Sequence, residues 1–267
     1  MLPDSPVSRR PPRSATAPTS PGGPSTQARG AKRALASPSG ARAAGFERSA
    51  LRERLLAGLA ELGLDPTLAD RLLDYLALLV KWNGVYNLTA VREPAAMLRQ
   101  HLLDSLSIVA PLAARLPQRD GAPAGRIIDV GSGAGLPGIV LALAWPRAEV
   151  VLVEPIGKKA AFLRQCQGEL ALTNLRVEAT RIESLGEPEA GQPPDLVVCR
   201  AFASLADYAT AIDRLVGPHT VIAAMKGAAP YDEVAALPAH WTVTEVLPLR
   251  VPELDAARHL VLMQRRP

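Results

Sequence analysis

The first half of the chain carries its apolar residues at helical spacing. Between residues 46 and 117 they recur every three or four positions in three stripes, which is typical of helices with one buried face. The stripes comprise Leu51, Leu55, Leu59 and Leu62; Leu68, Leu72, Leu76, Leu79 and Val80; and Leu98, Leu102, Leu106 and Val109. Asp65-Pro66 and Glu93-Pro94 resemble helix starts, and Asn83-Gly84 breaks the chain between them. We therefore predict an N-terminal cap of three or four helices over 46–117.

After a loop-like segment at 117–125, short apolar runs alternate with helical segments. Strands are predicted at 126–130, 149–154, 175–179, 195–200, 220–226, 241–249 and 259–265, and helices at 136–145, 158–172 and 205–215. This alternation predicts βαβ units, and hence an α/β domain over 118–267 with a mainly parallel, doubly wound sheet of seven strands. The last two strands should pair antiparallel, because the loop at 252–255 is too short for a helical crossover.

Length and charge add an appendage to this picture. The chain has 267 residues, 48% of them hydrophobic, which suits one main core. Residues 1–45 hold seven Lys or Arg and one acid. The whole chain has 30 basic and 26 acidic residues, so that residues 46–267 hold 23 basic and 25 acidic ones. This tail is rich in Pro, Ser, Ala, Gly and Arg and is predicted to be disordered. Its expected use is a weak, salt-sensitive attraction to nucleic acid, and the alternatives are a dispensable extension or an over-long start. An organelle transit peptide fits less well, because the apolar residues form no amphipathic stripe.

Several classes of protein do not fit the sequence. The two cysteines, Cys166 and Cys199, show no CxxC spacing and no histidine cluster nearby, which argues against a disulfide scaffold or a zinc site. No apolar run reaches about 18 residues, and the N-terminus lacks the apolar region of a secretory signal. We therefore expect a cytoplasmic protein without a membrane segment or a bound metal.

A glycine-rich turn follows the first predicted strand. The sequence Asp129-Val130-Gly131-Ser132-Gly133-Ala134-Gly135 lets the backbone approach a ligand where a Cβ atom would collide. Its spacing is GxGxG, because Leu136 stands where a dinucleotide fingerprint has its third glycine. A nucleoside ligand without a pyrophosphate therefore fits better than a dinucleotide. Taken alone, the pattern is weak evidence, and a tight structural turn is an ordinary alternative.

Two further segments lie at carboxyl ends of predicted strands, where open α/β sheets bind ligands. Glu154 ends the second strand, where a carboxylate can accept hydrogen bonds from both ribose hydroxyls. After the third strand, Ile182 could pack on adenine while the adjacent Glu183 reads its amino edge. Together these features predict a Rossmann-like, class I S-adenosylmethionine-dependent methyltransferase. A dehydrogenase, a GxSxG hydrolase and a Walker-loop enzyme are disfavoured, because the chain lacks their motifs.

Longer motifs resemble one family. They are Trp82 to Thr89 (WNGVYNLT), Arg99 to Ser105 (RQHLLDS), Asp129 to Gly138 (DVGSGAGLPG), Gly157-Lys158-Lys159 with Phe162-Leu163-Arg164, Arg200 to Ser204 (RAFAS), and Lys226-Gly227. From Phe46 to the C-terminus the chain resembles the bacterial ribosomal RNA small subunit methyltransferase G, or glucose-inhibited division protein B, family. The resemblance implies S-adenosylmethionine-dependent methylation of guanine N7 at position 527 of 16S ribosomal RNA.

The resemblance also implies roles for individual residues. The expected cofactor contacts are Gly131, Gly133, Gly135, Leu136, Glu154, Ile182, Glu183 and Arg200, and the expected RNA contacts are Lys158, Lys159, Arg164, Arg200 and Lys226. Many relatives have Asp in place of Glu154, and their loop often reads GTGPGLPG. Because guanine N7 has a lone pair and no proton, no general base is expected, and catalysis reduces to alignment and electrostatics. Arg200 and Lys226 are then candidates for positioning.

The implied partner is 16S ribosomal RNA or a small ribosomal subunit precursor, and we expect a monomer. Two alternatives stay open. One is a class I methyltransferase with a different acceptor, and the other is a non-catalytic RNA-binding protein with a degenerate cofactor pocket.

Overall fold

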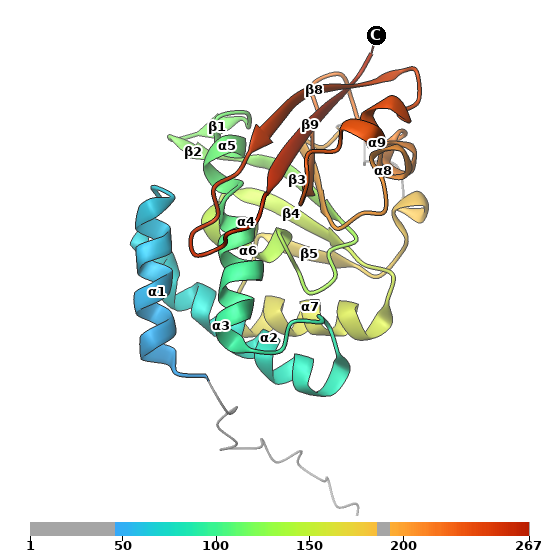
Figure 1. Ribbon diagram of the computed structural model, residues 1–267. Coiled ribbons are helices and arrows are strands. Elements are labelled where there is room, and N and C mark those ends of the chain that lie inside the picture. Colours follow the sequence, from blue (N-terminus) through green and yellow to red (C-terminus); the bar gives the residue numbers. More distant parts are fainter. Residues whose placement is uncertain (1–45, 186–192, 267) are drawn as a thin grey trace, which may run out of the picture. The chain divides into compact units, whose positions relative to one another are not determined.

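A computed structural model of the protein describes residues 46–185 and 193–266, so that the tail predicted at 1–45 lies outside the described residues. The segment 46–117 is helical, as predicted (Figure 1). Its elements are α1 (Arg48–Glu61), η1 (Pro66–Leu68), α2 (Ala69–Tyr86), α3 (Pro94–Met97), η2 (Leu98–Leu103), α4 (Asp104–Leu106) and α5 (Val109–Ala113). The side chains of Asp65 and Glu93 accept hydrogen bonds from the first turns of η1 and α3, which confirms both predicted starts. The division of the chain at residue 117 stays a prediction.

Seven strands form one sheet, in the order β5-β4-β3-β6-β7-β9-β8. The strands are β3 (Gly125–Val130), β4 (Ala148–Val153), β5 (Leu175–Glu178), β6 (Leu196–Arg200), β7 (Val221–Lys226), β8 (Trp241–Pro248) and β9 (His259–Arg265). Strands β3 to β7 pair parallel, whereas β9 lies antiparallel between β7 and β8. The prediction of a mostly parallel sheet with an antiparallel last strand is therefore confirmed.

Helices cover both faces of the sheet, because successive side chains of a buried parallel strand point to opposite faces. On β3, Ile127 joins the core that includes the cap, α6 (Gly138–Ala144) and α7 (Gly157–Glu169). Ile128 joins a second core with α8 (Leu205–Ile212), against which side chains near α9 (Tyr231–Ala235) pack. The sheet is thus doubly wound, as predicted.

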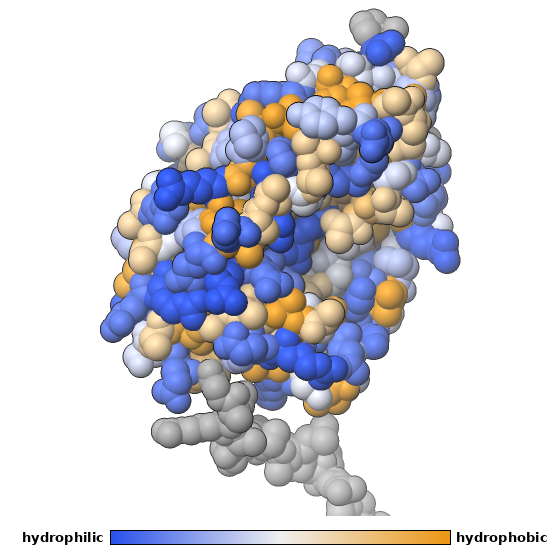
Figure 2. Space-filling model, in the orientation of Figure 1, coloured by the Kyte–Doolittle hydropathy of each residue, from blue (hydrophilic) through white to orange (hydrophobic). Residues whose placement is uncertain are grey.

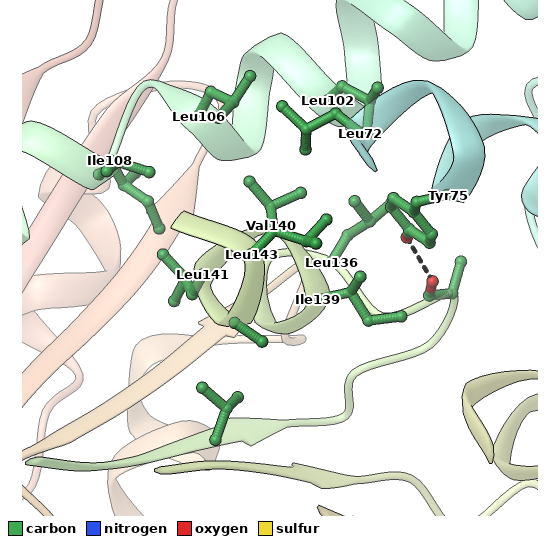
Figure 3. Packing of buried hydrophobic residues seen from close by; sticks show 14 of the residues in the cluster. Leu72, Tyr75, Leu102, Leu106, Ile108, Leu136, Ile139, Val140, Leu141 and Leu143 are labelled. Atoms are coloured by element: carbon green, nitrogen blue, oxygen red, sulfur yellow. Dashed lines mark hydrogen bonds between the residues drawn. The ribbon is translucent and has the colours of Figure 1, made fainter. Parts of the chain in front are cut away.

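The helical cap shares its core with the sheet domain. Figure 3 shows α6 contributing Ile139, Val140 and Leu143 toward Leu72 of α2 and Leu102 of η2. All five of these side chains are buried. Since each fully buried leucine-sized side chain contributes roughly 1.5–3 kcal/mol, the cap is bound firmly to the sheet at this contact.

Two local predictions were wrong. The segment expected as a loop holds a short hairpin, β1 (Gln118–Arg119) and β2 (Ala122–Pro123), whose turn Asp120-Gly121 has both φ angles positive, at 48° and 74°. Such Asp-Gly turns favour hairpins, so the sequence did carry this signal. Helix α6 begins at Gly138 and not at residue 136, because the glycine-rich turn extends to Pro137.

The surface and the helices also bear on membrane association. Within residues 46–185 and 193–266, none of the helices combines the length and the apolar character that a bilayer span requires. On the face drawn in Figure 2, hydrophobic side chains are scattered among hydrophilic ones.

Candidate functional site

The strand order reverses between β3 and β6, where open α/β sheets bind ligands at the carboxyl ends of the strands. A cavity of about 190 Å³ lies at this edge. It is lined by residues that end or follow four different strands, namely Val130, Gly131, Val153, Pro155, Arg181, Ile182, Glu183 and Phe202. Three predicted cofactor contacts, Gly131, Ile182 and Glu183, therefore lie at one cavity. Phe202 was not predicted individually, although it belongs to the RAFAS motif.

The glycine-rich turn needs its glycines for two different reasons. Gly131, Gly133 and Gly135 have φ angles of 68°, 59° and 88°, a region that L side chains rarely adopt. A Cβ atom on Gly131 would have no protein atom within 4 Å and would project into open space at the cavity. A Cβ atom on Gly135 would instead collide with the side chain of Ile139. Gly131 thus leaves room for a ligand, whereas Gly135 leaves room for the helix.

The helical cap holds the glycine-rich turn through a hydrogen bond. The hydroxyl of Tyr75 on α2 donates a hydrogen bond of 2.6 Å to the carbonyl oxygen of Ala134, as Figure 3 shows. Tyr75 is fully buried, and burial raises its pKa well above the ordinary value, so that it stays a neutral donor. Leu136, a predicted cofactor contact, is also buried, and its side chain packs in the core that the cap shares.

Glu154 joins the turn to the next loop. It is only 3% exposed, and its Oε2 accepts a hydrogen bond of 2.8 Å from the backbone N–H of Gly133. Its Oε1 accepts one of 2.9 Å from the N–H of Ile156. Because an ionised carboxylate offers about four lone-pair sites, acceptors are left for a ligand at this position. The predicted contact with a ribose stays a prediction that this geometry allows.

Asp129 is a buried acid whose role the sequence did not predict. It is 0% exposed, and its Oδ2 accepts a hydrogen bond of 2.9 Å from the N–H of Gly138, the first residue of α6. Its Oδ1 has no hydrogen-bond partner among the described residues. Burial raises the pKa of this carboxyl to about 7, against the lowering effect of the Gly138 hydrogen bond. Asp129 therefore ties the end of β3 to the start of α6.

Arg200 lines a second cavity, of about 420 Å³, that opens at the ends of β6 and β7. Its Nη1 contacts Oδ2 of Asp104 at 3.2 Å. Lys226 lines the same cavity, and its Nζ lies 2.8 Å from Oε2 of Glu233 on α9. The structure therefore brings Arg200 and Lys226 together, and it places both beside carboxylates that the sequence did not connect with them.

The other predicted RNA contacts lie on α7. Lys158 and Lys159 open this helix next to the loop that holds Glu154, and Lys158 Nζ donates a hydrogen bond of 2.9 Å to the carbonyl oxygen of Tyr86. Arg164 is exposed about two turns further along the helix. Their contact with RNA stays a prediction.

Both cysteines are buried, and their thiols are free. Burial raises the pKa of Cys199, so that this side chain is a packed core residue and not an activated nucleophile. Over the described parts of the chain, no group of three or more His, Cys, Asp or Glu is placed to hold a metal ion.

His101 is fixed inside the cap. Its Nδ1 lies 2.9 Å from the carbonyl oxygen of Gln100, and its Nε2 lies 2.8 Å from the Thr89 hydroxyl. Burial, together with the charge of Arg200, lowers its pKa to about 4. The neutral ring therefore donates from Nδ1 and accepts from Thr89, which fastens the loop after α2 to η2.

Comparison with known proteins connects this geometry to a family. Residues 69–261 match the family described as GidB, rRNA small subunit methyltransferase G. A ribosomal RNA small subunit methyltransferase G of Cupriavidus pinatubonensis (strain JMP 134 / LMG 1197) is 48% identical over 227 residues, which cover 82% of this chain and 95% of that protein. A protein of the same name from Acidovorax sp. (strain JS42) is 49% identical over 221 residues, which cover 80% and 94%.

A solved structure described as MtNAS in complex with MTA and tNA superposes with a TM-score of 0.50 at 15% identity, over 84% of this chain and 90% of that one. At this identity the likeness shows a shared fold alone.

Proposed function

The chain belongs to the ribosomal RNA small subunit methyltransferase G family, and from this membership we propose that it methylates N7 of the guanine at position 527 of 16S ribosomal RNA. At the coarser level, the protein is an S-adenosylmethionine-dependent methyltransferase of ribosomal RNA. The observation that carries the proposal is the match over residues 69–261, which include every residue that lines the two cavities.

The residues at the smaller cavity fit the cofactor. Gly131 leaves open space where any other residue would place a Cβ atom. Ile182 and Phe202 give the cavity apolar walls that suit a planar base, and Glu183 adds a hydrogen-bond acceptor. Glu154 would hold the ribose. These assignments are proposals, and they agree with a nucleoside that carries no phosphate.

The chain's own residues have little proton chemistry to perform. S-adenosylmethionine supplies an electrophilic methyl group when bound, and guanine N7 attacks with an in-plane lone pair and loses no proton. The protein therefore acts by holding the two reactants in line. Ala201, between the two cavities, has a φ angle of 57°, and this left-handed conformation turns the chain between Arg200 and Phe202. Such strain is tolerated where it positions functional groups.

Methyl transfer can be tested directly. The full chain is incubated with methyl-labelled S-adenosylmethionine and either naked 16S ribosomal RNA or small ribosomal subunits that lack the modification. Strand cleavage specific for N7-methylguanine then maps the product. Label at N7 of the guanine at position 527 is the expected result.

Other results separate the alternatives. Label at another base or in a protein supports a class I methyltransferase with a different acceptor. RNA binding without any transfer supports the non-catalytic alternative, and either outcome refutes the proposal.

A further inference from the structure

The larger cavity, of about 420 Å³, is distinct from the cavity assigned to the nucleoside. Arg200 and Ala201 line the larger one, and Phe202 lines the smaller one, so that this short segment runs between them. The larger cavity also receives Asp104 from the cap, Lys226 from β7, and Arg258 from the loop before β9. Four separate parts of the fold, counting Arg200 at the end of β6, therefore place charged side chains around one space.

Asp104 organises two of these charges. Its side chain is 5% exposed, its Oδ2 lies 3.2 Å from Nη1 of Arg200, and its Oδ1 lies 2.9 Å from Nε of Arg258. One buried carboxylate thus holds two guanidinium groups that come from residues 96 and 154 positions away. A buried charge requires such partners, because burying it alone costs several kcal/mol. The result is a pair of arginines with fixed positions.

The two arginines keep donors for a ligand. Within the described part of the chain, Arg200 bonds only through Nη1, to Asp104 and to the carbonyl oxygen of Gln100, and Arg258 bonds through Nε and Nη1. Arg200 Nε and Nη2 and Arg258 Nη2 have no protein acceptor there. The two side chains are 21% and 26% exposed, so that solvent and ligands reach them.

The charge around the cavity is positive. Three cations line it against the single carboxylate of Asp104. Lys226 is offset by Glu233, which leaves the two arginines sharing one negative charge. A guanidinium group presents its N–H donors in a planar fork that matches the oxygens of a phosphate.

We propose that this cavity binds a backbone phosphate of the RNA substrate, with Arg200 and Arg258 as its ligands and Asp104 as the residue that positions them. The inference rests on the proposed function, because it assumes an RNA substrate. The other anion available is the carboxylate of the cofactor. The RNA is favoured because Arg258 precedes β9, which lies three strands away from β3, the strand that leads into the glycine-rich turn.

The test compares variants of the full chain that remove one positive charge at different places. Arg258→Ala removes a proposed ligand. Arg147→Ala is the matched control, because Arg147 is half-exposed before β4, at the opposite end of the strands, where it pairs with Asp120. RNA affinity is measured over a series of salt concentrations with unmethylated 16S ribosomal RNA. Cofactor affinity is measured by calorimetry, and folding by thermal melting.

Loss of one phosphate contact lowers the magnitude of the slope of log K against log salt by roughly 0.7–0.9. We expect this reduction for Arg258→Ala, with a loss of RNA affinity of roughly tenfold at low salt, and a slope close to wild type for Arg147→Ala. Cofactor affinity should stay within twofold of wild type. Arg258→Lys should keep most of the slope, because it keeps the charge, while losing part of the affinity.

Asp104→Asn tests the positioning role. It should raise the KM for RNA severalfold while kcat at saturating RNA stays within twofold of wild type. A residue that only stabilises the fold would lower the melting temperature without this separation of KM from kcat. Equal effects on KM and kcat would therefore refute the positioning role.

Equal salt slopes for Arg258→Ala and Arg147→Ala would overturn the inference. Weaker cofactor binding by Arg258→Ala with an unchanged RNA slope would assign the cavity to the cofactor carboxylate instead. These results differ from failure of the proposed function. If wild-type protein transfers no methyl group to the small subunit but the slope of Arg258→Ala falls, the phosphate site stands and the assigned acceptor is wrong.

Discussion

Replacing Glu154 with alanine should weaken both cofactor binding and the fold. The carboxylate accepts hydrogen bonds from the backbone N–H groups of Gly133 and Ile156, at 2.8 and 2.9 Å, and so holds the glycine-rich turn against the loop after β4. In Glu154→Ala both donors lose an ionised partner, and the turn loses the constraint that keeps it ready for a nucleoside. The proposed ribose contact is lost as well.

The two losses can be given magnitudes. A hydrogen bond to a charged group contributes roughly 1.5–3 kcal/mol, and water offsets much of this wherever it can replace the partner. Ile156 is 46% exposed as a whole residue, so that water can reach its backbone, whereas Gly133 is less accessible. We expect the free energy of unfolding to fall by about 1–3 kcal/mol. Each kcal/mol lost lowers the melting temperature of a domain of this size by about 2–4 °C. Cofactor affinity should fall by about 1–3 kcal/mol, which corresponds to about 5- to 150-fold.

Calorimetric titration with S-adenosylmethionine, below the melting temperature of each variant, measures the effect on binding. Glu154→Gln is the control for shape, because its amide oxygen can still accept one of the two N–H groups; its affinity should lie between those of wild type and Glu154→Ala. If Glu154→Ala melts at a lower temperature but binds the cofactor as tightly as wild type, Glu154 only stabilises the loops. The reasoning that places it at the nucleoside is then refuted.

Three other substitutions test the surroundings of the site. In Gly138→Ala the new Cβ atom would lie 2.6 Å from Oδ2 of Asp129 and would also collide with Leu152. The free energy of unfolding, measured in denaturant, should therefore fall by about 1–3 kcal/mol. Unchanged stability would contradict the packing. Ala201 has a φ angle of 57°, and Ala201→Gly should relieve this left-handed conformation. The melting temperature should rise by about 2–4 °C, whereas methyl transfer should become slower. A variant as active as wild type would show that the strain has no function. The pKa of His101 is about 4 in the folded protein, below that of an unfolded histidine, so the unfolded state binds more protons between pH 6.5 and 4, and stability falls as the pH decreases through this window. Between pH 7 and pH 5, the free energy of unfolding of wild type, measured in denaturant, should therefore fall by up to about 2 kcal/mol more than that of His101→Gln. Equal decreases in the two proteins would contradict the assigned pKa.

Local patterns predicted most of the fold. All seven strands were found within one or two residues, because buried parallel strands are short apolar runs that contrast with the helices between them. Helix α9 was missed because it has five residues, too few to show a helical period. The start of α6 was misplaced because its first N–H group is capped by Asp129, a residue that lies nine positions earlier in another element.

The candidate site was predicted only in part, for a similar reason. Glycines and strand-end residues such as Gly131 and Ile182 are visible in a local motif, and both line the smaller cavity. The contact between Asp104 and Arg258 spans 154 positions and follows no periodicity, so that only the folded structure reveals it. Sequence motifs therefore locate the glycine-rich turn and the smaller cavity, whereas the ion pairs of the larger cavity join distant parts of the chain.

Buried acids allow some of these contacts between distant residues to be expected from the sequence. Among the described residues, Asp104, Asp129 and Glu154 are the three buried carboxylates, and each stands in or beside an apolar run of the sequence. An acid in such a place needs a partner, because an isolated buried charge is costly. The sequence alone therefore predicts that partners exist, and the structure identifies them as two arginines for Asp104 and backbone N–H groups for the other two. All three lie on segments that border one of the two cavities, so the buried acids gather where the fold forms its candidate site.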